Sequence, residues 1–304
     1  MEGIIFAFIT VLAWGSWIAP SQNVPLKGQQ TRTFYTSVAV LFLGVIVAGF
    51  LNFEGLNSKT FFGPVIGGFL WAFSCWFAFI GVSKIGMAKA FGIWAPMNVI
   101  VGITWGIVLR GEFIHTSTQN QLMALLSVVV MICGILLIVF SGDSDKTKVS
   151  KKDKIYGLLG TSGAGIGFAS YFIPINMAID GQPDFTMWVG TFPLAIGMFI
   201  GSLILVVLSK SSLKLEKGRH YPLILLSGAL WAIGNYGALV MMKPENLGTG
   251  QGFAVAQLCM VVNAILGIYI FKTPKPRTKA ANLTLIGVFI AAIGGAIFGY
   301  FVNN

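Results

Sequence analysis

The sequence is poor in charge. Only 10% of its 304 residues are charged, Asp and Glu number 10 together, and there are two histidines. With 56% apolar residues and a mean hydropathy of +0.82, the chain lies outside the range of soluble proteins. The scarcity of acids and histidines also leaves little material for a hydrolytic or metal-dependent enzyme. The composition therefore predicts an integral membrane protein that is not an enzyme.

Cysteine is equally scarce. Cys75, Cys133 and Cys259 each lie in an apolar run, without the spacing of a metal site or the even number of a disulfide framework. We expect no metal and no cofactor. The net charge of +10 would indicate nucleic acid in a soluble protein, but here the basic residues flank apolar runs, where they set orientation in the membrane. No nucleic-acid partner is therefore predicted.

Long apolar runs are abundant. A helix needs about 20 apolar residues to cross a bilayer, and the chain holds ten such runs. The sequence predicts an all-α polytopic membrane protein, embedded in the lipid bilayer of the plasma membrane by ten transmembrane helices. The expected spans are 3–20, 34–51, 61–82, 86–109, 121–140, 155–175, 186–208, 221–242, 247–271 and 281–301.

A polar stretch at 141–154 divides the chain into two parts, 1–140 and 155–304, that resemble each other. GFLWA at 68–72 matches GALWA at 228–232, and two further matches occur in the same order at nearly the same offset. Each part holds five spans, which is an odd number. The second part therefore enters the membrane in the opposite direction, and we expect two inverted five-helix repeats joined by a polar linker.

Charge inside the predicted spans is limited to Lys89, and Arg32 falls in a predicted loop. Two roles stay open for Lys89: its ammonium group reaches the lipid headgroups, or it takes part in transport. Proton coupling usually needs a buried carboxylate or histidine. Lys89 and the rim residue Glu112 are the candidates, and transport without protons is the alternative.

Aromatic and neutral polar residues recur at helical spacing within the spans. A neutral sugar is bound by this combination, because an aromatic ring covers its C–H face while amides both donate to and accept from its hydroxyls. Interhelical packing and hydrogen bonding are the alternative explanation. The candidate substrate-binding residues are Trp14, Ser16, Trp17, Trp71, Cys75, Trp94, Asn98, Ser170, Tyr171, Trp231, Asn235, Gln251 and Gln257.

These features predict a secondary transporter for a small neutral solute, most simply a monosaccharide such as glucose, working by alternating access. An exporter or exchanger of amino acids, nucleosides or amphiphilic compounds would use a similar uncharged aromatic cavity. A membrane scaffold or enzyme is the third class, and the missing acid and base groups disfavour the enzyme.

Several stretches resemble the glucose/ribose porter family of the drug/metabolite transporter superfamily. They are AWGSW at 13–17, GGFLWAFSCW at 67–76, RGE at 110–112, SGALWAIGN at 227–235 and KPENLGTGQGFAVAQL at 243–258. The resemblance implies ten helices, two inverted halves, a central cavity and monosaccharide uptake that is commonly proton-coupled. By matching position it implies substrate contacts at Trp71, Trp231, Asn235, Gln251 and Gln257.

Basic residues are distributed unequally between the two sides of the predicted bundle. The loops that join spans 1–2, 3–4, 5–6, 7–8 and 9–10 hold 17 of the 20 Lys and Arg residues, counting Lys89. Because basic loops stay in the cytoplasm, both termini are predicted to be extracytoplasmic.

Cysteine accessibility in intact cells tests this orientation. A thiol introduced at position 150 is expected to resist a membrane-impermeant reagent, whereas one at position 304 is expected to react, because the linker lies inside. Labelling at 150 but not at 304 would reverse the orientation. The background should lack the three native cysteines.

Overall fold

The computed structural model describes residues 2–111, 117–142, 149–243, 245–247, 252 and 255–302. The described residues are predominantly helical and contain no strand. The helices are α1 Glu2–Ser16, η1 Ala19–Ser21, α2 Gln29–Phe50, α3 Ser58–Ile85, α4 Met87–Arg110, α5 Thr118–Val139, α6 Lys151–Ser170, α7 Phe172–Ile179, α8 Met187–Leu208, α9 His220–Met241, α11 Cys259–Ile265, the π-helix η2 Leu266–Ile270 and α12 Lys279–Val302.

The described helices are those of a multi-pass membrane protein. Nine of them are long and apolar enough to cross a bilayer, and the shorter apolar helix Cys259–Ile270 lies in the ninth predicted span, 247–271, of which only part is described. Large apolar side chains face outward from them, including Phe42 (66% exposed) and Leu125 (61% exposed). Contiguous apolar surface of this extent requires lipid rather than water around the bundle.

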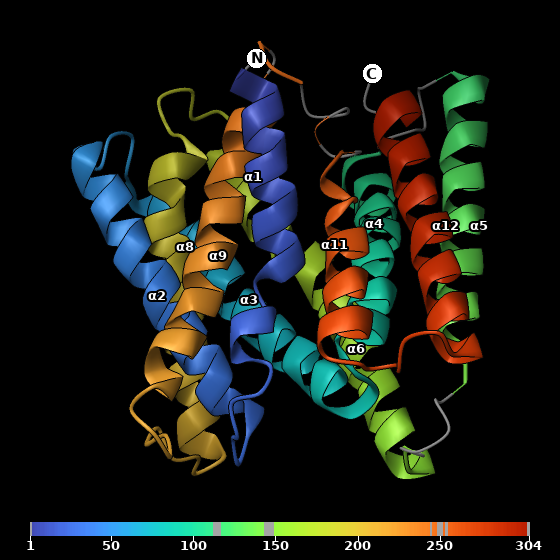
Figure 1. Ribbon diagram of the computed structural model, residues 1–304. Coiled ribbons are helices and arrows are strands. Elements are labelled where there is room, and N and C mark those ends of the chain that lie inside the picture. Colours follow the sequence, from blue (N-terminus) through green and yellow to red (C-terminus); the bar gives the residue numbers. More distant parts are fainter. Residues whose placement is uncertain are drawn as a thin grey trace.

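Both chain ends lie on one side of the bundle (Figure 1). We call this side the terminal face. The opposite side, where α5 ends and α6 begins, is the linker face (Figure 1). Helices α3 and α4 meet at the linker face, whereas α2 and α3 are joined at the terminal face.

Helices far apart in the sequence form the main contacts. α5 lies along α12, α1 packs on α9, α2 packs on α8 and α9, and α3 contacts both α6 and α8. The α3–α8 contact is a direct backbone approach, since a Cβ atom on Gly68 would overlap the carbonyl oxygen of Leu194 and one on Gly197 would overlap that of Val65. Only glycine permits backbones to come this close.

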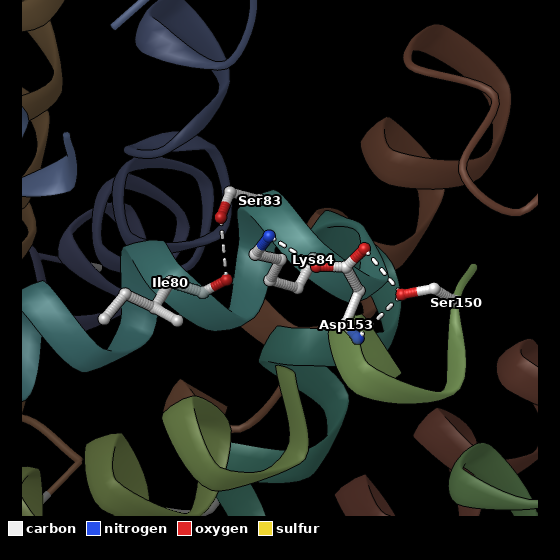
Figure 2. Close-up of polar contacts among 5 residues, drawn as sticks. All are labelled: Ile80, Ser83, Lys84, Ser150 and Asp153. Carbon is white, nitrogen blue, oxygen red and sulfur yellow. Dashed lines mark hydrogen bonds and ion pairs between the residues drawn. The ribbon is translucent and has the colours of Figure 1, made fainter. Parts of the chain in front are cut away.

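At the linker face, α3 and α6 are tied by an ion pair between Lys84 and Asp153 (Figure 2). Ser150 caps α6: its hydroxyl oxygen accepts from the Asp153 N–H at 3.0 Å and its hydroxyl donates to the Asp153 carboxylate at 2.8 Å. The cap starts the helix at Lys151, four residues before the predicted span at 155. The ion pair is partly exposed, so its contribution to stability is small.

Two other helix boundaries differ from the sequence prediction. α2 begins at Gln29 instead of residue 34, so Arg32 lies in a helix and not in a loop. The prediction that Lys89 is the only charged residue in the spans is therefore wrong. The predicted span 155–175 is divided at Tyr171 into α6 and α7, and Pro174 lies in the first turn of α7, where its missing N–H breaks no helical hydrogen bond.

Substitution of Gly68 by alanine should destabilise the fold by about 1–3 kcal/mol, because the added Cβ would separate α3 from α8. Thermal unfolding in detergent measures the effect. Gly102→Ala is the matched control, since no atom lies within 4 Å of a Cβ at that helical position. Equal unfolding temperatures for the two variants would show that the crossing tolerates a wider spacing.

Candidate functional site

Two tryptophans meet at the centre of the bundle. Trp71 lies midway along α3 and Trp231 midway along α9, and their ring centroids are 4.9 Å apart at an interplanar angle of 65°. Trp71 is fully buried and Trp231 is 7% exposed. Edge-to-face packing of this kind is the favoured geometry for aromatic rings. The two parts of the chain are therefore in contact through the pair.

Further aromatic groups surround this pair. Phe168 of α6 lies 5.9 Å from Trp71 and 6.4 Å from Trp94 of α4, centroid to centroid. Trp14 of α1 donates its indole N–H to the Trp231 carbonyl oxygen at 3.2 Å. Three further helices, α1, α4 and α6, thus complete the centre that α3 and α9 begin.

The structure brings most of the predicted aromatic residues together. One buried cluster contains Trp17, Trp71, Cys75, Trp94, Tyr171 and Trp231, and Trp14 packs against it. Ser16 is not part of this cluster, and its hydroxyl donates to the Leu12 carbonyl oxygen of its own helix. Asn98 is half-buried on α4, Gln257 is buried, and Gln251 lies outside the described residues.

Polar contacts lie on the terminal-face side of the tryptophan pair. Asn235, one helical turn beyond Trp231, donates to the Thr191 hydroxyl oxygen at 3.2 Å. The next residue, Tyr236, stacks on Trp188 with ring centroids 5.0 Å apart. Ser170 makes a different contact: its hydroxyl oxygen accepts the Trp105 indole N–H at 3.0 Å. Ser170 is the last residue of α6, directly before the break between α6 and α7.

A cavity of about 410 Å³ opens beside these polar contacts. It is lined by Leu51, Glu54, Asp184, Thr186, Trp188 and Val189. Trp188 belongs both to this cavity and to the stack with Tyr236, so the cavity adjoins the polar side of the site. Its two carboxylates are exposed, which leaves them at the rim rather than at membrane depth.

Arg32 is a buried charged residue near the tryptophan pair that the sequence analysis placed in a loop. It is 3% exposed, and its guanidinium carbon lies 5.0 Å from the centroid of Phe79, which in turn packs on Trp17 at 5.4 Å. The guanidinium is also within electrostatic range of the Cys75 thiol, one turn from Trp71. No local pattern in the sequence indicated that the helix begins before residue 34, because Gln29, Gln30 and Thr31 are polar.

Neither candidate for proton coupling is found at the tryptophan pair. Lys89 lies away from it, and Glu112 is not among the described residues. Lys89 occupies the first turn of α4, where it donates to the Gly142 carbonyl oxygen at the linker face. It also lines a small cavity with Lys154 and Leu158. Glu112 lies outside the described residues.

Comparison with known proteins identifies the family. The family described as "Sugar transport protein" matches residues 5–301. The chain belongs to this sugar transport protein family. Family membership makes it a transporter rather than an enzyme, as the shortage of acids indicated.

Relatives cover nearly the whole chain at low identity. The putative ribose uptake protein of Latilactobacillus sakei is 25% identical over 98% of this chain and 98% of its own length. The glucose uptake protein of Bacillus subtilis is 23% identical over 97% and 96%. A solved crystal structure covers 99% of this chain and 98% of its own at 13% identity, with a TM-score of 0.55, which shows a shared fold.

Proposed function

We propose that this protein takes up a monosaccharide by alternating access around the Trp71–Trp231 pair. The family and the relatives named for ribose and glucose uptake support sugar as the cargo. The observation that carries the proposal is the central position of the pair. Each tryptophan lies at the middle of its helix, where a carrier binds its solute between two halves.

The same proposal requires two inverted halves, 1–140 and 155–304, joined by the linker 141–154. Contacts that recur at matched positions support it. A Cβ on Gly68 would overlap the Leu194 carbonyl oxygen, and one on Gly228 would overlap the Thr36 carbonyl oxygen. Gly68 and Gly228 are 160 residues apart, while Thr36 and Leu194 are 158 apart. The α3–α8 crossing thus has a counterpart in the α9–α2 crossing.

A second pair of contacts is related by the same offsets of 158 and 160 residues. Thr191 accepts a hydrogen bond from Asn235, and Thr33, 158 residues before Thr191, has its side chain beside Cys75, 160 residues before Asn235. Trp71 and Trp231, which contact each other, are themselves 160 apart. These equivalences favour a pseudo-two-fold axis that passes between the two tryptophans.

Burial of the pair is consistent with an occluded state of the carrier. Trp71 and Cys75 have no exposed surface, so solute entry requires the rings to separate. Parted rings would present aromatic faces to the C–H surface of a sugar, while Asn235 and Thr191 would meet its hydroxyls from the terminal-face side. The excess of basic residues in the alternate loops supports a cytoplasmic linker face, with both termini on the extracytoplasmic side of the plasma membrane.

Substitution at the pair and at its polar neighbour tests the site. Asn235→Ala should weaken monosaccharide binding by about 0.5–1.5 kcal/mol, the net value of one hydrogen bond, and Trp231→Ala should weaken it at least as much. The measurement is uptake of labelled ribose, glucose and amino acids into proteoliposomes. Amino-acid uptake without sugar uptake would favour the exchanger alternative.

Ser127→Ala is the matched control for Asn235→Ala. Ser127 is fully buried in α5 and donates only within its own helix, to the Ala124 carbonyl oxygen. Its removal should leave half-saturation for sugar unchanged. If the Asn235 and Trp231 variants also transport with unchanged half-saturation, those side chains serve packing alone.

Energy coupling needs a separate experiment. Every described Asp and Glu side chain is exposed or half-exposed, so we expect uptake that equilibrates sugar without protons. The measurement is sugar uptake into proteoliposomes with and without an inward proton gradient. Accumulation that a protonophore abolishes would instead indicate proton symport, and its loss in Lys89→Met would assign the coupling to Lys89.

A further inference from the structure

Arg32 carries the one buried positive charge of a Lys or Arg side chain among the described residues. Its guanidinium lies on the Phe79 ring at 5.0 Å and beside Cys75. Cys75 is one helical turn from Trp71. The charge therefore borders the tryptophan pair from the linker-face side, opposite Asn235.

No protein group in the described part of the chain neutralises this charge. The buried Nε of Arg32 has no hydrogen-bond partner, and none of the ion pairs found there includes Arg32. Arginine stays protonated even when buried. Contact with one aromatic ring offsets only part of the cost of removing a guanidinium from water.

Unpaired polar atoms are frequent at the start of α2, the helix that carries Arg32. Nine buried side-chain polar atoms of the described residues lack a partner, and four of them, on Gln29, Gln30, Arg32 and Thr36, lie in the first two turns of α2. The N-cap Gly28 provides no side-chain cap, so the partial positive charge of the helix N-terminus adds to that of Arg32. The start of α2 thus offers one positive charge together with hydroxyl and amide groups.

We propose that Arg32 binds the carboxylate of a sugar acid, a monosaccharide in which one carbon is oxidised to a carboxylate. The guanidinium would hold the carboxylate through paired hydrogen bonds, Gln29 and Thr36 would meet hydroxyls, and the parted tryptophan rings would cover the C–H face. The positive charge would make the protein prefer a sugar acid to a neutral sugar. The uncharged remainder of the site would not provide this preference. This inference rests on the proposed function, which supplies the sugar skeleton.

Binding of D-glucuronate and D-glucose to the purified full-length protein tests the proposal. The two ligands differ only at C6, where a carboxylate replaces CH₂OH. The wild type should bind glucuronate at least tenfold more tightly than glucose. Arg32→Gln should remove that preference while changing glucose affinity less than threefold, and Arg32→Lys, which keeps the charge but loses the planar fork, should retain part of it.

Lys27→Gln is the matched control, because it removes one positive charge from an exposed position near the start of the same helix. It should leave both affinities unchanged. Equal or tighter glucose binding by the wild type would overturn the inference but leave the proposed function intact, and this comparison needs no variant. Absence of binding by either sugar would contradict the proposed function itself.

Two further outcomes would also overturn the inference. If Arg32→Gln binds glucuronate as tightly as the wild type does, the carboxylate is bound at another position. Chloride or phosphate that displaces glucuronate from the wild type at equal concentration, and fails to bind Arg32→Gln, would identify a small inorganic anion as the occupant of the Arg32 site.

Discussion

The close crossing of α3 and α8 at Gly68 and Gly197 is the constraint on which the centre of the bundle depends. With no side chain between the two backbones, α3 is held at a fixed depth and rotation. That rotation directs Trp71 toward α9 and Cys75 toward the start of α2. A larger residue at the crossing would displace α3 and with it Trp71 and Cys75.

The surrounding lipid imposes a second constraint. It limits the positions along the helices at which charged side chains can lie. Exposed Lys and Asp side chains occur at the helix ends, as with the Lys84–Asp153 pair at the linker face. Among the described residues, the buried side chains are uncharged at every position apart from Arg32 and the titratable His220. A charge in that position is costly unless a ligand offsets it, so its presence is better explained by solute recognition than by packing.

Apolar runs alone were sufficient to predict an all-helical membrane protein and the approximate position of most helices. They failed at helix starts, because Gln29 and Lys151 lie in polar segments that show no apolar periodicity even though α2 and α6 begin there. The same failure hid Arg32. Helical spacing grouped Trp71 with Cys75 and Trp231 with Asn235, but contact between α3 and α9 depends on tertiary packing that no local pattern contains.

Under the proposed repeat, the two copies share a glycine at the helix crossings and a tryptophan at the centre, but carry different polar groups next to the tryptophans. Gly68 and Gly228 match at the crossings, and Trp71 and Trp231 match at the centre. On either side of the tryptophans the copies diverge. Cys75 corresponds to Asn235, and Arg32, shifted by 158, corresponds to Gly190. The Cys75–Asn235 and Arg32–Gly190 differences give the two sides of the tryptophan pair different polar groups. Such a lining suits a solute whose two ends differ in chemistry.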